Sequence, residues 1–127
     1  MKIYESIDSI TIRVGESAKE NDELSMTSDP KHWWMHVAGC PGAHVVICHE
    51  GDQLPKETKR DAAVLAVYHS KAPDSKMSWV ELVRVENVSP LKQHGLVTLE
   101  GKVDQLTIFM RKEKERLERI LKTKRLI

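Results

Sequence analysis

A cluster of glycine and proline in the middle of the chain constrains the fold more than any other feature. The stretch HWWMHVAGCPGAHVVICH carries histidine or cysteine at every fourth position from His32 to Cys48. That spacing would stack five side chains on one face of a helix. Gly39, Pro41 and Gly42 interrupt the stretch, however, and a helix does not continue through such a segment. We therefore predict two strands joined by a turn.

The two strands are predicted at Trp33–Val37 and His44–Cys48, which are rich in aromatic and β-branched residues. If they pair around the turn, His36 and His44 lie across from each other, and Cys40 stands at the tip. A zinc site needs at least three convergent ligands, and the spacing matches no finger or ribbon motif. We predict no bound metal and two free cysteines that behave as small apolar side chains.

Two readings of this unit involve chemistry or binding. Cys40 beside His36 or His44 would form a thiol–imidazole pair, but the chain has no oxyanion-hole motif, phosphate loop or paired acids to support catalysis. A turn of proline and glycine flanked by rings can instead present backbone N–H groups to phosphate and aromatic faces to bases. We predict a binding protein without a cofactor.

The rest of the chain predicts one α+β domain, with a mostly antiparallel sheet, one packed central helix and a basic C-terminal helix. The apolar run AAVLAVY indicates that the central helix is buried. The predicted elements are a strand at Ile10–Val14, a short helical turn at Ala18–Leu24, a helix at Lys56–Ser70 led by Pro55, a strand at Trp79–Val88, and a hairpin of Leu96–Leu99 with Leu106–Met110.

Charge is unevenly distributed along the 127 residues. Residues 110–127 hold eight basic residues and three glutamates, a surplus of five positive charges, whereas the whole chain carries only +1. Such segregation favours an anionic partner for the C-terminal helix, or else a solvated amphipathic helix. No apolar run is long enough to span a membrane and no secretory leader is evident, so we expect a protein that does not contact membranes and is cytoplasmic, or organellar if a transit peptide has been removed.

Five motifs occur in a recognisable order: VGESAKENDELS, HWWMHVAGCPGAHVVI, LPKET with AAVLAVYHSKAPDS, VELVRVENV, and GLV. Together they resemble the NFACT-R domain, the predicted RNA-binding module of the NFACT proteins of ribosome-associated quality control, which also occurs free-standing. The resemblance runs from Ile12 to Met110. It suggests an NFACT-R-like domain over residues 1–110, with residues 111–127 as a basic helical extension of that domain.

The resemblance implies an α+β fold and nucleic-acid binding, with no established catalytic activity. The matching positions include Gly15, Asn21, Asp22, Leu24, Trp34, His36, Pro41, Gly42, His44, Pro55, Thr58, Ala62, Ser70, Lys71, Ala72, Ser75, Val80, Arg84, Asn87, Val88 and Gly95. From these and the basic residues we predict a nucleic-acid surface of Trp34, His36, Gly42, His44, Lys56, Lys71, Arg84, Arg111, Lys112 and Arg119.

Some positions depart from the family pattern. Glu16 replaces a basic residue, His32 an acidic one and Ala43 a serine, while Glu86 stands where a lysine is common. The basic loop that usually follows is shortened to residues 90–94. Because phosphate contacts supply most non-specific affinity, binding by this face alone is expected to be weak, and the basic C-terminal segment would have to compensate.

Three functions remain open on the sequence. The first is an RNA-binding module, with tRNA or ribosomal RNA as ligand and ribosome-associated proteins as further partners. The second is a protein-interaction adaptor, in which the apolar stripe of Leu117, Ile120 and Leu121 docks into a partner. The third is an RNA-processing enzyme that uses His36, His44 and Cys40.

Overall fold

The computed structural model describes residues 1–126 and shows a seven-stranded sheet, a two-stranded sheet and three α-helices. All strand pairs are antiparallel. The predicted α+β class is therefore confirmed. The strands are β1 (Lys2–Glu5), β2 (Thr11–Val14), β3 (Trp33–Val37), β4 (Val45–Ile47), β5 (Ser78–Arg84), β6 (Val88–Pro90), β7 (Val97–Leu99), β8 (Asp104–Ile108) and β9 (Arg125–Leu126). The helices are α1 (Ala18–Thr27), α2 (Lys56–Tyr68) and α3 (Lys114–Leu121).

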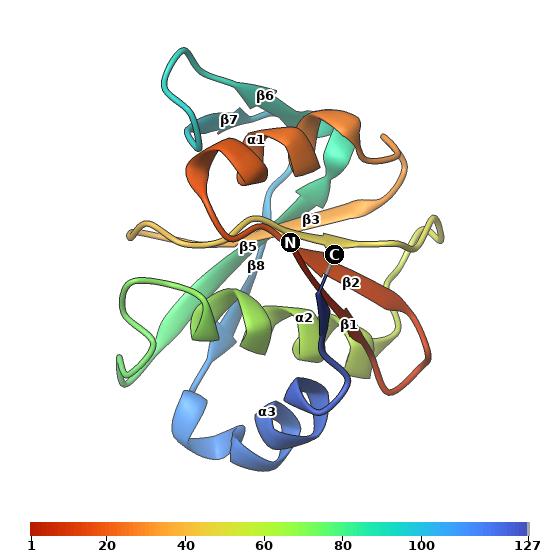
Figure 1. Cartoon of the computed structure of the whole chain (residues 1–127), viewed down its shortest axis with the longest axis vertical. Coiled ribbons are helices and arrows are strands. Elements are labelled where there is room, and N and C mark those ends of the chain that lie inside the picture. Colours follow the sequence, from red (N-terminus) through yellow and green to blue (C-terminus); the bar gives the residue numbers. More distant parts are fainter. Residues whose placement is uncertain (127) are drawn as a thin grey trace.

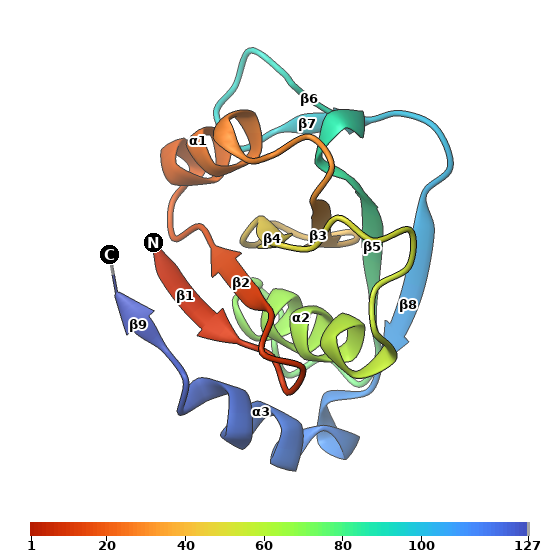
Figure 2. The same cartoon turned by 90° about the vertical axis from the view of Figure 1, so that its right-hand side faces the viewer.

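The large sheet has the order β8-β5-β3-β4-β2-β1-β9 and curls around α2, which lies inside the curve (Figure 2). The helix α3 packs below α2, whereas α1 and the small β6–β7 sheet cover the opposite face of the large sheet (Figure 1). Because the sheet surrounds α2 on several sides, every residue from Ala62 to Val67 is fully buried. The apolar run of this helix predicted that burial correctly.

The central strand–turn–strand unit is confirmed. Trp34 pairs with Val46 and Met35 with Val45, so the two strands run antiparallel from the turn. Gly39 in the turn has a φ of +81°, a left-handed conformation that glycine adopts without strain. One step beyond the paired residues, the rings of His36 and His44 lie 5.5 Å apart. His36 and His44, on either side of the turn, thus face each other on neighbouring strands, and the four-residue spacing of the wider stretch is a coincidence.

Two predicted elements differ from the structure. The strand predicted at Trp79–Val88 ends at Arg84, because Val85 and Glu86 form a 3-10 turn whose N–H groups donate to carbonyls just before β3. The chain then enters the small sheet. The predicted hairpin of Leu96–Leu99 with Leu106–Met110 is wrong, since β7 pairs with β6 and β8 pairs with β5. The strands β1 and β9 were not predicted.

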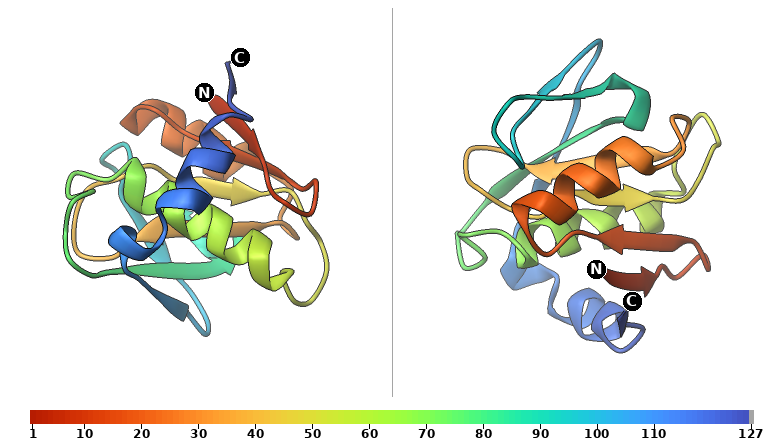
Figure 3. Two further views of the ribbon diagram at one scale, coloured as in Figure 1. Left: turned by 90° about the horizontal axis from the view of Figure 1, so that it is seen from below. Right: turned by 45° about the horizontal axis from the view of Figure 1, so that its top comes forward.

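The C-terminal segment is an integral layer of the fold. Leu117, Ile120 and Leu121 pack against the main core, with Ile120 fully buried. Beyond α3, β9 adds to the edge of the sheet beside β1 (Figure 3). The stripe expected to dock into a partner is therefore already occupied by the chain's own core, which contradicts that adaptor hypothesis.

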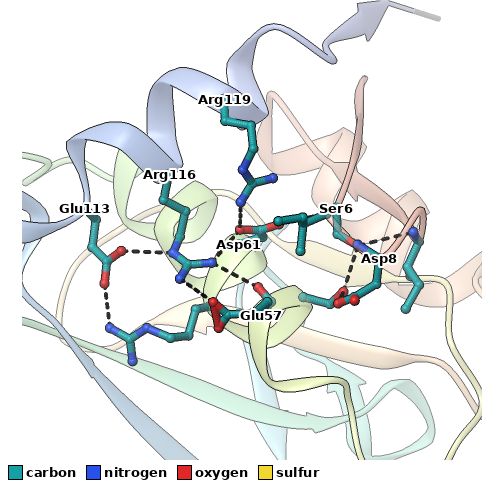
Figure 4. A network of polar contacts seen from close by, with 11 residues as sticks. Ser6, Asp8, Glu57, Asp61, Glu113, Arg116 and Arg119 are labelled. Carbon is teal, nitrogen blue, oxygen red and sulfur yellow. Dashed lines mark hydrogen bonds and ion pairs between the residues drawn. The ribbon is translucent and has the colours of Figure 1, made fainter.

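Charged side chains reinforce this docking (Figure 4). Arg116 Nη1 lies 2.7 Å from Asp61 Oδ1 on α2, and Arg119 donates to the same oxygen. Arg60 and Arg116 both contact Glu113 just before α3. Two of the basic residues of the C-terminal segment, Arg116 and Arg119, therefore stabilise the docking of α3 on α2.

Within residues 1–126, no helix has both the length and the apolar character needed to cross a bilayer.

Candidate nucleic-acid interface

A cavity of about 710 Å³ opens where the β3–β4 turn meets α1, the loop before β7 and the end of α2. That volume falls in the range typical of small-ligand sites, roughly 300–1,000 Å³. Its lining includes five of the ten predicted site residues, namely Trp34, His36, Gly42, His44 and Lys71. The structure thus brings together the half of the predicted surface that came from the turn and the end of the central helix.

Close packing of the turn on the end of α2 places Lys71 at this cavity. The Lys71 N–H donates to the carbonyl of Pro41 at 2.9 Å. Gly42 permits the contact, because a Cβ there would lie 2.9 Å from Val37 Cγ1 and 3.3 Å from the Cα of Ser70. The exposed Lys71 amine therefore belongs to the same surface as the turn.

Trp34 and His44 lie beneath that surface, each only 1% exposed. The Trp34 indole N–H donates to Ser25 Oγ at 3.0 Å, and Ser25 Oγ lies 2.8 Å from His44 Nδ1. Because the carbonyl of Gly95 can only accept, His44 Nε2–H donates to it at 3.2 Å, and the unprotonated Nδ1 of the neutral ring accepts from the Ser25 hydroxyl. His44 is therefore a neutral structural link between α1 and the loop before β7, and Trp34 is a core residue.

Residues of the first motif hold the same loop. Asp22 accepts hydrogen bonds from the Gly95 N–H at 2.9 Å and from His94 Nδ1 at 2.7 Å. Asn21 Oδ1 accepts from the His44 N–H at 3.1 Å, and its amide donates to the carbonyl of Gly42 at 3.4 Å. Asn21 and Asp22, which match the family pattern, thus hold the walls of the cavity together.

Replacing Asp22 with alanine is expected to release the loop before β7. The change removes the acceptor for both Gly95 and His94, which should cost about 1–2 kcal/mol of unfolding free energy. Amide exchange at Gly95 should accelerate much more than exchange at Val64 in the core. The neighbouring Glu23→Ala change on the exposed face of α1 is the matched control, and equal exchange in both variants would contradict the assigned contacts.

The three buried or half-buried histidines on the cavity wall, His36, His44 and His69, contribute no positive charge at neutral pH. Burial lowers the pKa of His44 and of His69 to about 4, and burial likewise lowers the pKa of His36. The charged side chains of the lining are Lys2 and Lys71 against Glu16 and Glu81, and Lys2 lies 3.3 Å from Glu16. The charges balance, so the cavity is polar but close to neutral inside, with Lys71 as its exposed cation.

The other predicted site residues lie elsewhere. Arg84 stacks on Trp33, with its guanidinium 3.9 Å from the ring centre, and it donates to the carbonyls of Glu50 and Gly51. Arg119 pairs with the buried Asp61. Lys56, Arg111 and Lys112 are exposed but belong to the α2–α3 side of the sheet, away from α1 (Figures 1 and 2).

Within the described residues, the series of histidines and cysteines from His32 to Cys48 does not come together as one set of metal ligands. Among residues 1–126, the group of metal-ligating side chains close enough to share an ion is Asp29, His32 and Glu50, whose ligand atoms lie within 4.8 Å of one another. Cys40 and Cys48 are free and half-buried.

Sequence reasoning missed Glu81 as a member of the cavity wall. It pairs with His36 across β3 and β5, so the two side chains share one face of the sheet. Only the register of two strands that are distant in sequence reveals this neighbour. Lys2, His69 and His94 were missed for the same reason, since each reaches the cavity from a different part of the chain.

Comparison with known proteins agrees with this geometry. The sequence model described as the NFACT protein RNA binding domain matches residues 1–106. The chain belongs to the NFACT-R family. Within that family it is similar to the Rqc2 homolog RqcH of Bacillus subtilis, with 31% identity over 113 residues, covering 87% of this chain and 19% of that protein. RqcH of Streptococcus suis is 39% identical over 98 residues, covering 71% and 17%.

A solved structure shows the same NFACT-R fold. The C-terminal part of the fibronectin/fibrinogen-binding protein from Streptococcus suis aligns with a TM-score of 0.77 and 31% identity, over 85% of this chain and 44% of that one. The chain spans about a fifth of the length of the RqcH proteins that it matches.

Proposed function

We propose that this NFACT-R chain is an RNA-binding module of ribosome-associated quality control, with tRNA or ribosomal RNA as its ligand. The observation that carries the proposal is the match to the RNA-binding family over residues 1–106, which includes every segment of the cavity wall. The proposed contact surface is the rim of the cavity, where Gly42 and Lys71 meet His36. Cytoplasmic location is part of the same proposal.

Binding without catalysis is the function that this site supports best. His44 uses both ring nitrogens, one with Ser25 and one with Gly95, so it has no free nitrogen to act as a general base. His36 packs against Trp34 in an offset stack with ring centres 5.9 Å apart, an arrangement suited to presenting a flat surface. An RNA-processing role for His36, His44 and Cys40 is therefore not favoured.

Replacing Lys71 with alanine is expected to weaken tRNA binding by removing one phosphate contact. The slope of log affinity against log salt should fall by roughly 0.7–0.9, the value expected for each phosphate neutralised. Filter binding or fluorescence anisotropy between low and physiological salt measures both the affinity and the slope.

The matched control is the double change Arg111→Ala with Lys112→Ala, which removes exposed charge on the α2–α3 side. We expect it to affect binding less than Lys71→Ala. A larger effect of the control pair would move the interface to the α2–α3 side, and absence of salt-sensitive RNA binding by the unaltered chain would overturn the proposed function.

A further inference from the structure

The cavity has a wall of stacked rings that ends in a histidine. Trp34 and His36 are two residues apart on β3, and their rings are inclined by only 14°. The His44 ring meets His36 edge-on, at an interplanar angle of 89°. Trp34 and His44 are buried, but His36 is half-buried and lines the cavity. His36 is thus the half-buried end of a row of rings that lines the cavity.

A carboxylate lies beside that ring. Glu81 on β5 is directly opposite His36 on β3. On the other side of His36 lies His44, next to β4. Within the described residues, no hydrogen bond or ion pair engages the Glu81 side chain, although it is half-buried and lines the cavity. A half-buried carboxylate beside a ring is suited to accept hydrogen bonds from the edge of a flat heterocycle.

The charge distribution of the cavity suits the base of a nucleotide in the interior and its phosphate on the rim. The interior has equal numbers of acidic and basic side chains and neutral histidines, so it offers little attraction to a phosphate. Lys71 is exposed on the rim, where a phosphate would remain hydrated. The volume of about 710 Å³ exceeds what one nucleobase with its ribose requires.

We propose that the cavity takes up one unpaired nucleobase, which stacks on His36 and presents an amino or imino edge to Glu81 while its phosphate contacts Lys71. The inference rests on the proposed RNA binding and deepens it, because it specifies single-stranded RNA or a flipped-out base over a regular duplex. Stacking on an aromatic ring tolerates any base, whereas the carboxylate favours guanine, whose N1–H and N2 amino group can both donate to it, over uracil, which offers N3–H alone.

Nucleotide titrations followed by NMR test the pocket directly. GMP, AMP and CMP should shift the ring signals of His36 and the indole N–H of Trp34, while ribose 5-phosphate, which has no base, should leave both unchanged. The Glu81→Gln change should narrow the difference in affinity between GMP and UMP. Equal shifts with ribose 5-phosphate and with GMP would overturn the inference.

The second test measures how tightly protein variants bind a single-stranded and a duplex RNA. The His36→Ala change should weaken binding of a single-stranded oligonucleotide by roughly 5- to 150-fold, the equivalent of one lost base stack, and binding of a duplex by less than about 2-fold. His36→Phe keeps a flat ring and should restore most of the affinity. His32→Ala, at the other end of the same stretch and outside the cavity lining, is the matched control.

The outcomes separate this inference from the function on which it rests. Suppose that RNA binds with the expected salt dependence, but the His36→Ala change weakens binding of single strands and duplexes equally. This result would overturn the nucleobase pocket and leave the proposed function standing. Failure of all RNAs to bind at low salt overturns the proposed function and this inference with it.

Discussion

Replacing Asp61 with alanine is expected to destabilise the protein by about 3 kcal/mol, more than any other single charge removal. The Asp61 side chain is fully buried and accepts from Arg116, from Arg119 and, at 3.0 Å, from the backbone N–H of Ile7. Its loss removes one acceptor from each of two cations and from one amide. The value lies at the low end for buried pairs because Arg119 is 36% exposed and Arg116 retains Glu57 and Glu113.

The midpoint and slope of urea unfolding measure this effect, and the slope should stay unchanged. Glu57→Ala is the matched control, since Glu57 contacts Arg116 at 3.1 Å but is 48% exposed. Exposed pairs contribute about 1 kcal/mol or less. Equal losses for the two variants would show that Asp61 does not carry the docking of α3.

Lowering the pH from 7 to 5 is expected to remove about 4 kcal/mol of stability, about 2 kcal/mol for each of two histidines. Burial lowers the pKa of His44 and of His69 to about 4, against 6.5 for an unfolded chain. Between these values the unfolded state binds more protons than the folded state. Stability is therefore complete above pH 6.5 and falls as the pH drops towards 4.

Unfolding free energies measured at several pH values test this expectation. The His69→Gln variant can still bond with Tyr4, whose hydroxyl lies 2.9 Å from His69 Nε2, and it should remove about half of the pH dependence. Aspartate and glutamate contribute little to the slope above pH 5, because their unfolded pKa values lie lower. A flat profile between pH 7 and 5 would contradict the buried, neutral state of both histidines.

Local patterns in the sequence predicted the elements that local forces determine. Gly39 and Pro41 marked the central turn, and the apolar run of α2 predicted its burial. The partners of β7 and β8 were predicted wrongly because nearby strands were assumed to form a hairpin. In the structure, contacts of Val85 and Glu86 with the segment before β3 redirect the chain. Pairings of this kind depend on residues about 50 positions away, which no local pattern reveals.

The candidate site shows the same difference between what local patterns predict and what depends on distant residues. The turn residues Gly42 and His36 were found from sequence, and the structure places them at the cavity with Lys71. Arg119 was expected on the surface because charge alone does not reveal which carboxylate lies opposite in the fold. Glu81 was not recognised because an acidic residue in a strand acquires meaning only from its neighbour across the sheet.

The pairing of β1 with β9 has a consequence for the edge of the large sheet. The register sets Lys2 opposite Leu126 and Ile3 opposite Arg125, so β9 covers the outer edge of β1. Without β9, the backbone N–H and C=O groups of that edge would be an open template for another extended chain. This two-residue strand therefore protects the sheet against edge-to-edge aggregation.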